Sequence, residues 1–253
     1  LDNARGVAAA PSLFAGWASL WLGELLFAGW AVCHELGRRW ATPVFGSEDV
    51  GGAPRWRSFV GLGTSAGALP LLLGATIARA GGYSAWVAVA AGGGPLHGFD
   101  RGFGYIFAGL MLADFAQRTM RTPLLKVHHA TCLAGHAWCA LCAPSGLPGY
   151  FTGVVALELG SAATCVHALW PRHLTPPLLL ICMTLSNLAA VAALRAFSDQ
   201  AAAEAPAGRW VAVLVSLALV GVRQVDAISI CIATPALPPL PPAWRDYARA
   251  KGQ

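Results

Sequence analysis

The feature that most constrains this 253-residue sequence is a series of long apolar runs separated by short polar segments. Each run approaches the roughly 20 residues that an α-helix needs to cross the hydrocarbon core of a bilayer. The runs cover residues 12–34, 57–79, 102–118, 124–143, 148–170, 175–197 and 209–231. We therefore expect an all-α fold, a polytopic transmembrane helical bundle of about seven spans.

The composition excludes the other broad classes of protein. Hydrophobic residues make up 56% of the chain and charged residues only 11%, whereas ordinary soluble domains are about 25% charged. A soluble surface could not be covered with so few charges, and disorder needs low hydrophobicity with high charge. The formal charge is +5, but no basic stripe with interleaved aromatic residues is present, so we expect no nucleic-acid binding.

The chain divides into three parts by composition. Residues 1–56 hold the first apolar run and a basic loop, residues 57–231 form a helical bundle, and residues 232–253 are Pro-rich and then basic. The extra apolar run at 83–94 is too short to span a bilayer, so we expect an interfacial or re-entrant piece there.

Loop charges predict an orientation in the membrane. With seven spans, the side that holds the C-terminus carries most of the Lys and Arg residues, in loops 35–57, 118–126 and 170–175 and in the tail. By the positive-inside rule, the N-terminus then lies on the opposite side. The sequence starts at Leu1 rather than Met, which suggests trimming or a removed leader. We expect an endomembrane location, or an organellar one if a leader was removed.

Titratable side chains at bilayer depth are costly and are therefore candidates for a functional site. In this chain they are Glu24, Asp114, His128, His129, His136, Glu158, His167, Arg223 and Asp226. Arg223 and Asp226 lie three residues apart on one helix, so we expect them to form an ion pair. His129 and His136 lie seven residues apart and share a helix face. Three neighbouring helices could therefore place Asp114, the histidines and Glu158 around one interior pocket.

Four segments resemble those of a known family, the TLC-domain proteins. Gly109–Asp114 resembles the family's Gly-Tyr-x-x-x-Asp segment, with Leu in place of Tyr. His128-His129 resembles its His-His pair, Glu158–Thr164 its later Glu-x-Ser-Thr-type segment, and Arg57 its basic residue before the second span. The resemblance covers roughly residues 57–231 and implies a membrane protein with a role in lipid biology.

The resemblance is closer to the non-synthase branch of this family than to the ceramide synthases. Ceramide synthases follow the His pair with a His-Asp-x-x-Asp stretch, whereas this sequence has no aspartate between Asp114 and Asp199. Members of the non-synthase branch are linked to lipid composition or sensing. This branch implies a protein that binds or senses membrane lipid, alone or as a subunit of a larger membrane assembly, with membrane lipids and other membrane subunits as partners.

The alternative is an acyltransferase that uses the His pair and acyl-CoA. A histidine near neutral pH can remove a proton from an attacking amine or hydroxyl, or accept an acyl group itself. In this hypothesis His129 is the base or nucleophile, His128 its partner and Asp114 an orienting group. The residues expected to line a lipid-binding polar pocket are Glu158, His136, His167 and Arg57.

We expect no cofactor and no metal. Two weaker interpretations remain open. A haem could lie between His167 and either His129 or His136 on the neighbouring helix. A zinc ion could use histidines from the set His128, His129 and His136 together with Glu158, although adjacent histidines on a helix point in different directions.

Overall fold

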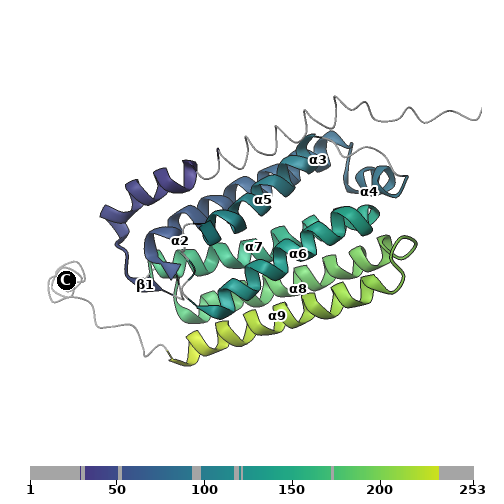
Figure 1. Cartoon of the computed structure of the whole chain (residues 1–253). Coiled ribbons are helices and arrows are strands. Elements are labelled where there is room, and N and C mark those ends of the chain that lie inside the picture. The colour runs from purple at the N-terminus through teal and green to yellow at the C-terminus, as the bar shows by residue number, and fades with distance from the viewer. Residues whose placement is uncertain are drawn as a thin grey trace, which may run out of the picture.

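The computed structural model describes residues 29, 32–50, 53–92, 98–116, 120, 122–171 and 174–233. Most of the predicted first span, including Glu24, and the Pro-rich tail after residue 233 lie outside these described residues. The long helices run side by side along roughly one direction (Figure 1). After the helix over residues 32–45, the helices of the described chain are α2 (Arg55–Leu62), α3 (Leu69–Arg79), the short α4 (Tyr83–Ala91), α5 (Gly98–Ala116), α6 (Pro123–Cys142), α7 (Leu147–Leu169), α8 (Pro176–Gln200) and α9 (Gly208–Ala233).

Four helical stretches of the described chain are long and apolar enough to cross a membrane. They are Arg55–Arg79, Pro144–Leu169, Pro176–Gln200 and Gly208–Ala233. The described part of the chain therefore confirms an all-α membrane protein but only four of the seven predicted spans. The apolar part of α5, Gly102–Ala116, is shorter than a span, and Lys126 together with three histidines lowers the apolar character of α6.

The segment predicted as a polar loop, 35–57, is partly helical instead. Residues 32–45 form a helix, and two short strands, β1 (Asp49–Val50) and β2 (Ala53–Pro54), pair before α2. The helix accommodates its charges because Glu35 accepts hydrogen bonds from Arg38 and Arg39, at 2.7 and 2.9 Å, on the next turn. Such pairs stabilise exposed helices, so a polar stretch was wrongly predicted to be a loop.

Caps and prolines set the ends of the long helices. Pro123 begins α6, and the side chain of Thr122 accepts a hydrogen bond from the Leu125 amide, as is typical of a helix N-terminus. At the C-terminus of α7, the guanidinium of Arg55 donates to the carbonyls of Ala168 and Leu169, at 2.9 and 3.1 Å. These contacts satisfy carbonyls that have no partner within the helix.

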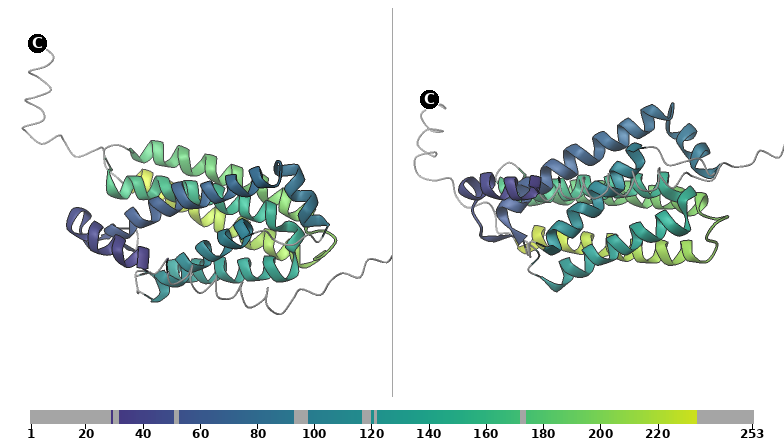
Figure 2. Two further views of the ribbon diagram at one scale, coloured as in Figure 1. Left: turned by 90° about the horizontal axis from the view of Figure 1, so that it is seen from above. Right: turned by 45° about the horizontal axis from the view of Figure 1, so that its top comes forward.

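Helix α7 lies at the centre of the bundle, between α2 and α8 (Figure 2). Its glycines let α8 approach closely, which is how membrane helices commonly pack. A Cβ added at Gly149 would lie 2.5 Å from the backbone nitrogen of Phe197, and one added at Gly160 would lie 2.2 Å from the Ser186 hydroxyl. The tight α7–α8 contact fixes the position of the motif around Glu158.

The two sides of α7 differ in what holds them together. Towards α3, α4 and α5, buried aromatic and aliphatic side chains form the main core, in which the Phe103 and Phe151 ring centroids lie 4.3 Å apart. On the other side, α8 and α9 are linked by polar contacts. Asn187 donates to Gln224, and Gln224 donates to Thr184, each at 2.9 Å.

Candidate functional site

Asp114 is the centre of a closed network of charged side chains. Its carboxylate is fully buried, and Arg57 approaches it with two nitrogens, Nε at 3.2 Å from Oδ1 and Nη2 close to Oδ2. His129 Nε2 lies 2.9 Å from Oδ2. The network joins α2, α5 and α6 and brings together Arg57, Asp114 and His129, three of the residues that the sequence analysis selected.

Both ring nitrogens of His129 are engaged. Nε2 bonds to Asp114, and Nδ1 lies 3.0 Å from the carbonyl of Leu125, one turn earlier on α6. With both nitrogens in hydrogen bonds to its surroundings, the His129 ring is fixed in place and holds α6 against α5.

His34 also belongs to this network, although the sequence analysis did not select it. It is fully buried, with Nε2 at 3.4 Å from Asp114 Oδ1 and its ring edge-on to Trp56 at a centroid distance of 5.3 Å. The only signal in the sequence was a titratable side chain at the end of the first apolar run. The helix over 32–45 brings it to the ends of the other spans, because Gly37 packs directly on Val60 of α2.

A second group of polar residues surrounds Glu158 on α7. Ser65 donates to Glu158 Oε2 at 2.5 Å, across the interface between α7 and the second span. Ser65 lies in a π-helical segment, η1 (Gly63–Ala68), that interrupts the α-helical register between α2 and α3. Such segments are frequent at functional sites, and this one directs a hydroxyl towards Glu158 that the sequence analysis did not anticipate.

Arg223 contacts α7 rather than its predicted partner Asp226. Its Nη1 donates to the Ser161 hydroxyl at 3.1 Å, and its Nη2 donates to the Leu157 carbonyl at 2.7 Å. Gly160 leaves space for this contact, since a Cβ there would lie 2.9 Å from Nη2. The predicted ion pair with Asp226 is wrong. Arg223 lies on the face of α9 that meets α7, where α7 offers hydrogen-bond acceptors, whereas Asp226 is exposed.

His128 lies beside this second group and outside the Asp114 network. Its Nε2 is 3.7 Å from the Cys132 sulfur, one turn later on α6. The ring interacts electrostatically with His129, Arg223 and Arg57, and Glu158 interacts with both Arg223 and Arg57. The two neighbouring histidines therefore lie close together but differ in their hydrogen-bond partners. We call the group of Glu158, Arg223 and His128 the open cluster.

The structure places the other two predicted histidines elsewhere. His136 lies among aromatic rings, with centroids 6.1 Å from Phe107 and 5.8 Å from Tyr150. His167 Nδ1 is 2.7 Å from the carbonyl of Leu174, beyond the end of α7. In the described chain, no group of three His, Cys, Asp or Glu side chains could hold a metal ion.

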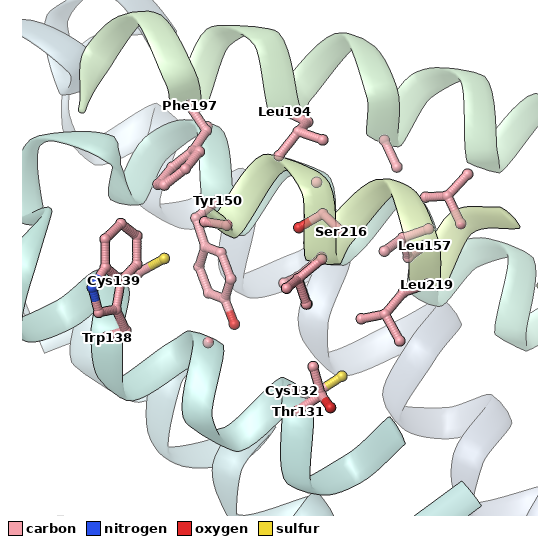
Figure 3. Close-up of a pocket in the computed structure, with 18 of the residues that line it drawn as sticks. Thr131, Cys132, Trp138, Cys139, Tyr150, Leu157, Leu194, Phe197, Ser216 and Leu219 are labelled. Atoms are coloured by element: carbon pink, nitrogen blue, oxygen red, sulfur yellow. The ribbon is translucent and has the colours of Figure 1, made fainter. Parts of the chain in front are cut away.

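An apolar cavity of about 140 Å³ lies between α6, α7, α8 and α9, with Phe107 of α5 contributing to its wall. Trp138, Tyr150 and Phe197 surround one end, and Cys132, Leu157 and Leu219 lie at the other (Figure 3). The second end adjoins the open cluster, because Leu157 precedes Glu158 and Leu219 lies one turn before Arg223 on α9. The structure thus places a group of half-buried charged and titratable side chains next to a hydrocarbon-lined space, although none of these three side chains lines it.

Comparison of the chain with known proteins identifies no relative. No protein-family model matches the sequence, and neither a curated protein nor a solved structure is significantly similar to it.

Proposed function

We propose that this chain is a multi-pass membrane protein that binds a membrane lipid, with part of a hydrocarbon chain held in the cavity between α6 and α9. The main observation in support of this proposal is the cavity. Its volume, about 140 Å³, is close to that of an engineered apolar cavity of ~150 Å³ that stays dry and binds benzene. It can therefore hold a segment of about six carbons.

The surroundings of the cavity favour a lipid over a water-soluble ligand. Three of the four helices that form it, α7, α8 and α9, are candidate membrane spans. An unfilled apolar space of this size loses the dispersion contacts that its walls would otherwise make. A hydrocarbon chain entering from the bilayer would restore them at little cost in desolvation, since it leaves one apolar environment for another.

The resemblance to TLC-domain proteins supports the same class of ligand. The Glu158–Thr164 segment that resembles the family follows directly after Leu157, which lines the cavity, and three of its residues have definable contacts. Glu158 accepts from Ser65, Gly160 leaves space for Arg223, and Ser161 accepts from Arg223. These contacts support a role for the Glu158–Thr164 segment in positioning a lipid.

A cavity-filling substitution tests lipid binding. Gly135 lines the cavity, and a Cβ added there meets nothing within 4 Å, so Gly135→Leu fills the space without a backbone clash. Gly221 of α9 also has an unobstructed Cβ but does not line the cavity, so Gly221→Leu is the matched control.

The measurement is lipid retained per protein chain after purification in mild detergent, counted by mass spectrometry. We expect the wild-type chain and Gly221→Leu to retain about one lipid per chain, and Gly135→Leu to lose most of it. A wild-type chain free of lipid, or a Gly135→Leu chain that retains as much as the control, would contradict the proposal.

Acyl transfer is the second candidate, favoured by the position of His128. This imidazole lies at the cavity end and outside the Asp114 network, so it is the member of the pair that could accept a proton from an attacking group. We expect any transfer from acyl-CoA to a lipid amine in vesicles to be lost in His128→Ala. A folded wild-type chain without turnover would reject this candidate and leave lipid binding intact.

A further inference from the structure

We infer that the occupant of the cavity is an amphiphile with an anionic oxygen headgroup, a carboxylate or a phosphate, which binds the guanidinium of Arg223. This inference rests on the proposed lipid binding and specifies the chemistry of its headgroup.

The first observation is that the charge of Arg223 is satisfied only in part. Its hydrogen-bond partners are the neutral oxygens of Ser161 and Leu157 and, more weakly, the sulfur of Met183 at 3.9 Å. The side chain is half-buried, and its Nε is buried and has no hydrogen-bond partner among the described residues. Within the described chain, no carboxylate lies within ion-pair distance of it, and Glu158 interacts with it only at longer range. Charges with little access to water are normally paired directly, so this guanidinium has the capacity to bind an anion at hydrogen-bond distance.

The second observation is where this guanidinium lies. Leu219 and Val220, one turn before Arg223 on α9, line the cavity, and so does Leu157, whose carbonyl accepts from Arg223. Arg223 therefore sits at the end of the cavity away from Trp138 and Phe197. A ligand with its chain between α6 and α9 would bring its headgroup to this position.

The other charged groups nearby determine how the anion is recognised. Arg57 is committed to Asp114, so it does not compete for the ligand. Glu158 is in the same cluster and offsets the charge of Arg223, while its Oε2 is bound to Ser65 of the second span. Because the net charge is small, attraction over a distance is weak. Recognition then depends on directed hydrogen bonds from the guanidinium, which suit carboxylate and phosphate oxygens.

Three probes with the same oleyl chain separate headgroup from chain. Oleate carries a carboxylate, 1-oleoyl lysophosphatidate carries a phosphate, and oleyl alcohol carries no charge. Binding of each to the full chain in phosphatidylcholine nanodiscs is measured by native mass spectrometry at equal probe concentrations. We expect at least one anionic probe to bind tenfold or more tightly than oleyl alcohol, and the probe that does so identifies the source of the anion.

Substitutions at Arg223 then test whether this residue causes the preference for anionic probes. Arg223→Gln should bind all three probes within about twofold of one another. Arg223→Lys keeps the positive charge but not the planar guanidinium, and it should keep part of the preference for anionic probes. This variant keeps the test valid if Arg223→Gln does not fold. The control is Arg209→Gln, since Arg209 lies at the start of α9, donates to the Ser198 carbonyl and does not line the cavity. It should keep the full preference.

Two results would overturn the inference. One is a wild-type chain that binds oleyl alcohol as tightly as the anions, and the other is an Arg223→Gln chain that retains the wild-type preference. Both leave the proposed lipid binding standing. If each probe bound Gly135→Leu as tightly as it binds the wild-type chain, the cavity would not be the lipid site. The headgroup inference would then fail together with the proposed lipid binding.

Discussion

The two charged clusters of this bundle lie on neighbouring helices but differ in how completely their charges are satisfied. Asp114 has Arg57 and His129 as hydrogen-bonding partners and His34 beside it. Among the described residues, Arg223 of the open cluster hydrogen-bonds only to neutral groups, and Glu158 interacts with it at longer range. A fully satisfied buried network favours one arrangement of helices, whereas an incomplete one retains capacity to bind something else. We therefore assign the first cluster a structural role and propose ligand binding for the second.

The largest expected effect is the loss of the Asp114 charge. Asp114→Asn would leave Arg57 without its counter-ion and His129 without its carboxylate partner, and breaking a buried ion pair by removing one partner costs about 3–5 kcal/mol. We expect unfolding in detergent, followed by temperature or denaturant, to shift accordingly. Asp226→Asn is the control, because Asp226 is exposed on α9 and forms no ion pair with any residue that the structure describes. Equal stability of the two variants would remove the basis for calling the Asp114 cluster structural.

The adjacent histidines offer a sharper test, because they occupy the same helix and differ in partners. His129→Gln removes a hydrogen bond to a buried carboxylate, for which we expect a loss of about 1.5–3 kcal/mol. His128→Gln should cost less than about 1 kcal/mol, because the one hydrogen-bond contact of His128 among the described residues is the Cys132 sulfur at 3.7 Å. Both variants are measured by the same unfolding assay. A His128 variant as unstable as the His129 variant would show that the two clusters act as one structural unit.

The sequence indicated which charged residues would converge, because titratable groups are costly at bilayer depth. Asp114, His129 and Glu158 were selected on this ground and Arg57 from the family resemblance, and the structure places them in two linked clusters rather than around one pocket. Partner choice was harder to predict. Arg223 bonds to Ser161, 62 residues away, in preference to Asp226 on the same helix, because only packing decides which face of α9 meets α7.

Ser65 and His34 show two further limits of sequence reasoning. The π-helical turn at Gly63–Ala68 shifts the register of the second span, so helical periodicity does not predict that Ser65 faces Glu158. His34 lies on a helix that continues through a stretch predicted as loop, since the ion pairs of Glu35 satisfy its charges. In both cases the neighbouring sequence gives no sign of the contact, because tertiary packing produces it.

The smallest expected effect concerns the surface counterpart of these clusters, the pair of Glu48 and Arg55. Their side chains lie 2.8 Å apart near the C-terminus of α7, and Glu48 is exposed. The hydrogen bond from Arg55 holds the pKa of Glu48 below its ordinary value of 4.5. A carboxyl whose pKa is lowered by folding adds stability above its ordinary pKa and loses that contribution as the pH falls through the lowered value.

Glu48→Gln should therefore lower the melting temperature slightly at pH 7, and the difference from wild type should shrink as the pH falls below 4.5. The melting temperatures of both proteins are measured in detergent at pH 7 and again below pH 4.5. Exposed pairs contribute little and are screened by salt, so added salt should also reduce the difference. If Glu48→Gln proved as destabilising at pH 7 as Asp114→Asn, burial would not explain why one charged pair stabilises the bundle more than another. The contrast between the closed and open clusters would then need another explanation.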